Sequence, residues 1–161
     1  MAIIIEDGTI VAGANSYASE AELTAFAAER GATLTGAADV LLIKAMDYVE
    51  SFRKAFQGSK VDAAQPLQWP RSGAYVDGYP IPTTEIPVDL KRAQMQAAIE
   101  SDSTDLNPNT GQAVKREKVD VIEVEYESGG ANQAPTFRKV DAYLEPLLSS
   151  GYSTITLGVM R

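Results

Sequence analysis

The sequence has no histidine and no cysteine among its 161 residues, and it has a single tryptophan. These absences exclude a zinc finger, a thiolate nucleophile, a disulfide framework and a Ser-His-Asp triad. Oxygen ligands alone could hold a metal, which would favour Mg²⁺ or Ca²⁺. No apolar run approaches the roughly 20 residues that span a bilayer, and the N-terminus has no basic signal-peptide start. We therefore expect no membrane association and a cytoplasmic origin.

Acidic residues outnumber basic ones, with 22 Asp+Glu against 14 Lys+Arg, and the net charge is −8. Residues 1–50 hold most of this excess, whereas 51–100 are nearly balanced. The densest basic cluster, Lys115, Arg116 and Lys118, is interrupted by Glu117 and is more typical of a strand start than of a nucleic-acid patch. Affinity for DNA comes largely from neutralised phosphates, so this excess of acidic residues disfavours tight binding to a DNA backbone.

Hydrophobic periodicity predicts four helices. Ser19 and Glu22 have capping-box spacing, which predicts a helix over 19–30. Apolar residues recur at helical spacing from 35 or 36 to 57, which predicts a central scaffold helix about 33 Å long. A third helix is expected over 87–101, and a fourth begins near Phe137 and is kinked or ended by Pro146.

The remaining segments are extended. Residues 58–87 contain five prolines and are predicted to be an ordered loop rather than a linker. A strand region is expected over 115–127, where apolar residues and glutamates alternate. The fold class is therefore mainly α: a small helical bundle with one long central helix, a minor β element and an extended C-terminal arm. A helical adaptor domain would span 1–150 and the arm 151–161.

No sequence motif indicates catalysis. Phosphate-loop, nucleophile-elbow, dinucleotide-binding and EF-hand patterns are all missing. Glu123, Glu125 and Glu127 form an acidic ladder that is more typical of a solvated strand face than of a cation site. We predict a non-enzyme with no catalytic residue, no cofactor and no metal. A hydrolase that depends on Glu123 or Asp77 is the alternative.

The aromatic residues of the proline-rich loop have two interpretations. Beside an arginine they form a weak version of the platform on which single-stranded bases stack. The favoured interpretation is that Trp69 fills a core or a subunit contact. The predicted subunit-interface loop comprises Trp69, Pro70, Arg71, Tyr75 and Tyr79.

The C-terminal segment is apolar and β-branched. It is either a disordered end or, as we favour, a strand that adds to the sheet edge of another protein. The residues predicted to form this docking arm are Ser153, Thr154, Ile155, Thr156, Leu157, Gly158, Val159 and Met160.

Short segments in order along the chain resemble a family of tailed-bacteriophage proteins. They are EDGT (6–9), ANSY (14–17), AMDYV (45–49), LQWPRSG (67–73), YPIP (79–82), EIP (85–87), VKREKV (114–119), IEVEY (122–126), VDAYL (140–144) and PLL (146–148). Members are often labelled DnaT-like single-stranded DNA-binding proteins, and they are also similar to head-to-tail connector (adaptor, head-completion) proteins.

The connector resemblance implies a structural virion protein of the phage neck. Its partners would be the portal protein, tail, nozzle or tail-completion proteins, and other copies of itself in a dodecameric ring. DNA would pass through the ring without specific binding, and an acidic lining suits such a channel. Before assembly the protein would reside in the host cytoplasm. The alternative is a single-stranded DNA-binding replication accessory protein.

Overall fold

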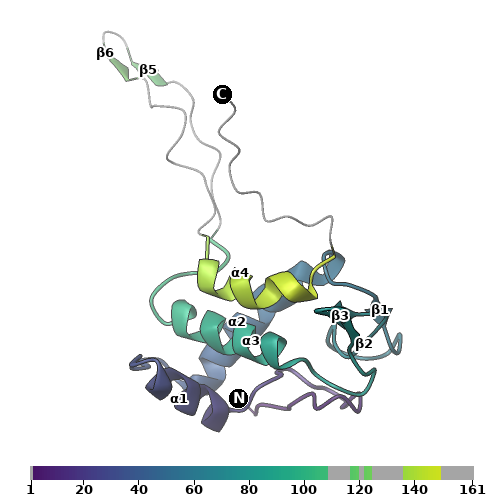
Figure 1. The fold of residues 1–161 in the computed structure, drawn as a ribbon. Helices are drawn as coiled ribbons and strands as arrows, with labels where there is room; N and C mark the ends of the chain where they lie inside the picture. Colours follow the sequence, from purple (N-terminus) through teal and green to yellow (C-terminus); the bar gives the residue numbers. More distant parts are fainter. Residues whose placement is uncertain (1, 109–116, 120–121, 125–135, 150–161) are drawn as a thin grey trace. The chain divides into compact units, whose positions relative to one another are not determined.

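The computed structural model describes residues 2–108, 117–119, 122–124 and 136–149 (Figure 1). The chain divides into two compact units. One comprises Met1–Leu106 with Phe137–Arg161, and the other comprises Asn107–Thr136. In the described residues, no helix is both long enough and apolar enough to cross a membrane.

Helix α1 spans Glu20–Glu29, and its capping box is formed as the sequence predicts. The Ser19 hydroxyl accepts a hydrogen bond from the Glu22 amide, and the Glu22 carboxylate accepts one from the Ser19 amide at 2.7 Å. Gly31 follows in the left-handed region (φ +65°), where a helix commonly ends. Leu23, Phe26 and Ala27 are the buried face.

Helix α2 spans Ala38–Ser51 and is followed by the 3₁₀ turn η1 (Phe52–Lys54), so the long helix predicted over 35–57 is wrong at both ends. At its start, the Asp102 carboxylate accepts hydrogen bonds from the amides of Thr35 (2.7 Å) and Gly36 (2.8 Å). These bonds hold Thr35 and Gly36 as a loop, and the Thr35 amide in particular keeps the pKa of Asp102 below its ordinary value.

Helix α3 (Val88–Ser101) occupies the centre of the helical unit, between α1 and α4 in Figure 1. It matches the length of α2 and packs against α1, α2 and α4, so no single long central helix organises the fold. Its small residues Ala93, Ala97 and Ala98 are buried and allow the other helices to approach closely. Helix α4 spans Arg138–Leu144 and passes at Pro146 into the 3₁₀ turn η2 (Glu145–Leu147).

A buried amide joins three parts of this core. The Gln94 side chain, on α3, accepts a hydrogen bond from the Tyr17 amide at 2.9 Å. Its nitrogen donates to the Ser16 hydroxyl (2.8 Å) and to the Leu42 carbonyl (3.2 Å). The N-terminal segment and α2 are therefore both tied to α3.

The segment between η1 and α3 forms two small antiparallel ribbons. Strand β1 (Ser59–Lys60) pairs with β2 (Arg71–Ser72), and β3 (Tyr75–Val76) pairs with β4 (Tyr79–Pro80). Asp77 and Gly78 join β3 to β4, and both have positive φ, as a type I′ turn requires.

The second unit contains a short hairpin. Strand β5 (Glu117–Val119) pairs antiparallel with β6 (Ile122–Val124), and Val119 lies opposite Ile122. Both short strands fall within the strand region predicted over 115–127. The described part of the alternation of apolar residues and glutamates, Ile122 to Val124, lies on β6 alone.

Candidate nucleic-acid interface

A groove with a volume of ≈ 740 Å³ opens in the helical unit where α1, α3 and α4 meet. Its floor and sides include the apolar residues Ala32, Ile99 and Ala142. We call it the Arg30–Lys139 groove, and its polar and aromatic lining comprises Arg30, Gln96, Glu100, Ser103, Lys139 and Tyr143.

Arg30 is held in place at the end of α1. Its guanidinium lies over the Phe26 ring, 3.3 Å from the centroid, and donates to the Phe26 carbonyl at 3.1 Å. It also forms an ion pair with Glu29 at 3.4 Å, and its side chain keeps 34% of its surface exposed. An arginine fixed in this way presents its charge without losing much further conformational entropy on binding.

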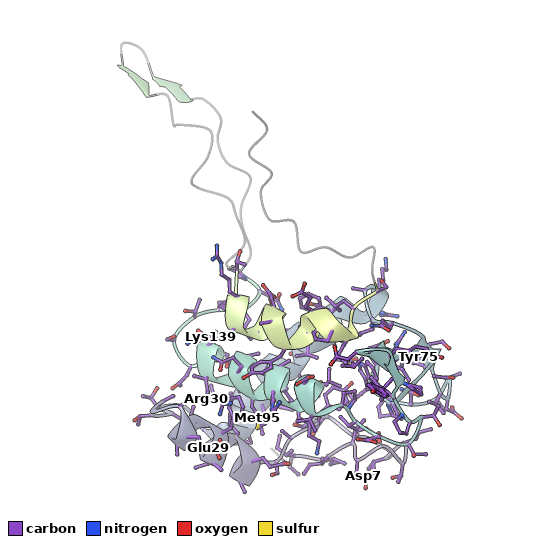
Figure 2. The ribbon with its side chains drawn as sticks, in the orientation of Figure 1. Asp7, Glu29, Arg30, Tyr75, Met95 and Lys139 are labelled. Atoms are coloured by element: carbon purple, nitrogen blue, oxygen red, sulfur yellow. The ribbon has the colours of Figure 1, made fainter. Side chains whose placement is uncertain are left out.

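Helix α4 supplies a second cation and an aromatic ring. Phe137, Val140 and Leu144 are buried, and Phe137 packs edge-on against Tyr48 on α2 at 5.6 Å between ring centroids. This anchoring leaves Lys139 exposed, and Tyr143 one helical turn further on is half-buried against the core. Figure 2 labels Lys139 and Arg30, which come from α4 and from the end of α1, with α3 between these helices.

Helix α3 contributes a hydrogen-bonded polar pair. Gln96 is buried, and its side-chain nitrogen donates to a carboxylate oxygen (Oε1) of Glu100 one turn later, at 2.9 Å. The lining thus combines two cations, one carboxylate, an amide and a tyrosine. Such a mixture can contact a phosphate, a stacked ring and the hydrogen-bonding edge of a base.

The residues of the predicted interface loop lie in two different environments, some buried and some exposed. Trp69 and Pro70 are buried inside the same chain, and the Trp69 ring packs edge-on against Phe56 at 5.9 Å. Arg71 is also buried, where its guanidinium donates to the carbonyls of Gln57 (2.6 Å) and Gly58 (2.7 Å). Desolvation lowers the pKa of Arg71. None of these three presents a surface for stacking bases, and their place in a subunit interface stays a prediction.

The two tyrosines of this loop are exposed. The side chains of Tyr75 and Tyr79 lie on the β3–β4 hairpin, with 51% and 77% of their surface accessible. Tyr75 pairs with Pro80 and Tyr79 with Val76, so the two rings project from opposite faces of the ribbon. They do not form one platform with Trp69 and Arg71. The Asp77-Gly78 pair is the sequence signal that could have identified this hairpin.

A half-buried carboxylate ties the loop to the helices. One oxygen of Glu50 accepts hydrogen bonds from the Tyr17 hydroxyl (2.9 Å) and the Gln68 amide (3.1 Å). Desolvation raises the pKa of Glu50 above its ordinary 4.5, although these two hydrogen bonds act in the opposite direction. Burial and the neighbouring Glu50 charge raise the pKa of Tyr17 well above its ordinary value, so its hydroxyl remains a donor.

The raised pKa predicts a pH-dependent effect of Glu50→Gln. The folded state binds the Glu50 proton more tightly than the unfolded state, so the contribution of Glu50 to stability is present below 4.5 and is lost as pH rises through the folded pKa. The amide oxygen of glutamine can accept the same two hydrogen bonds. We expect the Tm of Glu50→Gln, measured by circular dichroism, to rise relative to the Tm of the wild type as the pH increases from about 4 to about 7.5. A Tm difference that is constant across this range would contradict the assignment.

The other predicted residues carry no site in the described chain. Asp77 is exposed in its turn, and no group of three or more acidic residues that could hold a metal occurs in the described ranges. The arm residues Ser153 to Met160 lie outside the described residues. The groove is absent from the sequence-based prediction because Arg30, Gln96 and Lys139 are far apart along the chain and no local pattern connects them.

The described residues form a mainly helical protein with minor β structure and a groove of mixed charge. A family model described as "Putative DnaT-like ssDNA binding protein" matches residues 1–161. The chain belongs to this family. It is a binding family rather than a catalytic one, so the protein is not an enzyme, in agreement with the sequence prediction. No curated protein and no solved structure gives a significant match.

This match overturns the assignment to head-to-tail connectors. The predictions that depended on this assignment were also wrong. They were the portal and tail partners, the dodecameric ring of a phage neck and the passage of unbound DNA. The segments that carried the resemblance include many core residues, among them Tyr17, Trp69 and Leu144, which are fully buried. Such residues specify packing inside the subunit and carry no information about its partners.

Proposed function

We propose that this protein binds single-stranded DNA and that the Arg30–Lys139 groove holds part of the strand. The family description is the observation that carries the proposal. The groove supports it with cations from two elements and with Tyr143, because strand binding combines positive charge along the backbone with aromatic rings under the bases.

The net charge favours a single strand over a duplex. A duplex presents about one phosphate charge per 1.7 Å of its axis, and a protein with a net charge of −8 is repelled by that density. A single strand also exposes its bases, so stacking and hydrogen bonds can supply affinity where backbone charge supplies little. The binding free energy therefore depends on a few well-placed side chains.

Reversing the charge of Lys139 is expected to weaken binding. In Lys139→Glu, a carboxylate replaces one of the two groove cations and repels the strand. We expect the dissociation constant for a fluorescent oligonucleotide to rise about tenfold or more, because a charged hydrogen bond contributes about 1.5–3 kcal/mol. The slope of the logarithm of the association constant against the logarithm of salt concentration should become shallower by about 0.7, the amount for one phosphate contact on a single strand.

Lys54→Glu is the matched control. Lys54 is exposed on η1 and does not line the groove, so its reversal changes the net charge equally. We expect it to shift the affinity by much less than Lys139→Glu. Equal losses in the two variants would show a general charge effect and contradict the groove, whereas no wild-type binding at low salt would refute the function.

A further inference from the structure

The groove-lining residues of α4 belong to a helical face that continues beyond the groove. Lys139, Ala142 and Tyr143 all line the Arg30–Lys139 groove. Their spacing of three and four residues places them on one side of the helix, and the next position with this spacing is Pro146 in the turn η2. All but the half-buried Tyr143 are exposed, so this face is open to solvent from the groove to Pro146.

The same face carries a positive charge and no carboxylate between residues 139 and 146, all of which the structure describes. The acidic residues of α4 and η2 are Asp141 and Glu145, and each follows a residue of the face by two positions. Two positions turn a helix by more than half a revolution, so both carboxylates point away from the face. A polyanion can therefore follow it without meeting like charge there.

At Pro146 this face reaches the β3–β4 hairpin. The Gln57 side chain donates a hydrogen bond to the Pro146 carbonyl at 2.8 Å, and its oxygen accepts one from the Tyr75 amide at 3.1 Å. The Gln57 backbone amide also donates to the Leu147 carbonyl at 3.0 Å. A single side-chain amide thus joins η2 to β3, and Figure 2 shows Lys139 at the start of α4 and Tyr75 beyond its end.

The Tyr75 ring lies on the solvent side of the hairpin. Ala74 is buried and Val76 packs against the core, and side chains alternate along a strand, so Tyr75 between them faces the other way. About half of its surface is accessible, at 51%. Its backbone is fixed by the pairing with Pro80 and by the Gln57 hydrogen bond. An exposed ring on a fixed backbone offers a surface on which a base can stack.

We propose that the bound single strand runs from the groove along the Lys139–Pro146 face and that one of its bases stacks on Tyr75. This inference rests on the proposed function and extends its site by a second contact point. Seven residues at a rise of 1.5 Å place Pro146 about 10 Å beyond Lys139, which is room for roughly three nucleotides at ~3.4 Å each. A strand must therefore be several nucleotides longer than the groove to reach the hairpin.

Tyr75→Ala tests this path with thymidine oligomers of two lengths. For a labelled 12-mer, measured by fluorescence anisotropy, we expect the dissociation constant to rise about fivefold or more, the usual effect of losing one stacked base. The salt dependence of binding should stay unchanged, because no phosphate contact is lost. A 3-mer fills the groove without reaching the hairpin, so its affinity, measured by competition, should be the same in Tyr75→Ala and the wild type. Tyr75→Phe keeps the ring and should bind the 12-mer like the wild type.

Tyr79→Ala is the matched control, because Tyr79 is exposed on the same hairpin but projects from its opposite face. It should leave the affinity for the 12-mer unchanged, and equal Tm values should confirm that all variants are folded. Equal affinities of Tyr75→Ala and Tyr79→Ala for the 12-mer would overturn the inference and leave the proposed function standing. An equal loss for the 3-mer and the 12-mer in Tyr75→Ala would overturn it as well. A wild type that binds no oligomer would refute both.

Discussion

Trp69→Ala is expected to lower the free energy of unfolding by about 3–5 kcal/mol, the usual cost of removing a buried tryptophan. Trp69 is fully buried, and it packs edge-on against Phe56. Its amide donates to the Tyr17 hydroxyl at 3.1 Å, so the backbone at this position is also tied to the helices. Because a domain of this size is stabilised by about 5–15 kcal/mol, the variant should be close to unfolding at physiological temperature.

Trp69→Phe separates the volume of the ring from its polar group. Nε1 of Trp69 is buried and has no hydrogen-bond partner among the described residues. Phenylalanine leaves a cavity, but it also removes an N–H whose unpaired burial costs about 1–3 kcal/mol. We therefore expect Trp69→Phe to be destabilised much less than Trp69→Ala.

Urea denaturation followed by far-UV circular dichroism measures both variants. The wild type offers a second probe, because the emission of its single tryptophan should shift to longer wavelength on unfolding. A loss below about 1 kcal/mol for Trp69→Ala would show that this ring does not support the core.

Gly58→Ala is also expected to be strongly destabilising. Gly58 has φ +64°, and a Cβ at this position would lie 2.1 Å from the Ser72 carbonyl oxygen. The close approach occurs beside the β1–β2 pair, where Arg71 also binds the Gly58 carbonyl at 2.7 Å. Relieving the clash would pull these strands apart, so we expect a loss of about 3 kcal/mol or more, the sum of a left-handed backbone cost and an overpacking cost.

Gly31→Ala is the matched control for this prediction. Gly31 has nearly the same backbone conformation (φ +65°), but an added Cβ would meet no atom within 4 Å. Its replacement should cost only the backbone term, about 1–2 kcal/mol. Chemical denaturation of both variants gives the difference, which isolates the contact with Ser72. Equal losses would show that the clash relaxes without cost.

The acidic N-terminal third illustrates how a charge count misleads. Its excess of carboxylates suggested the lining of a DNA channel, but several of them serve the fold. Glu6 is fully buried and accepts hydrogen bonds from the amides of Gly8, Ile10 and Val11. Glu22 caps α1, and Glu50 holds Tyr17 and Gln68. A net charge gives the sum of such groups and not their positions, so it could not identify the function.

Local signals determined much of the helical structure. The α1 boundaries follow from a capping box and a glycine, because these interactions join residues three or four positions apart. Helix α3 begins one residue after Pro87, and α4 ends in a 3₁₀ turn that contains Pro146. Both ends of α2 were misjudged. Its apolar periodicity continues past Ser51, where the chain enters the 3₁₀ turn η1, and the Asp102 carboxylate, distant in sequence, binds the amides of Thr35 and Gly36 ahead of its start.

By itself, the sequence determined that the protein is mainly helical, that it lacks histidine and cysteine, and where α1 and α3 lie. The tertiary structure alone decided that α3 occupies the centre, that Trp69 and Arg71 are buried, and that Arg30, Glu100 and Lys139 line one groove. The physical reason is the range of the interactions. Capping and turn preferences act over a few residues, whereas the groove exists only where packed helices bring distant side chains together.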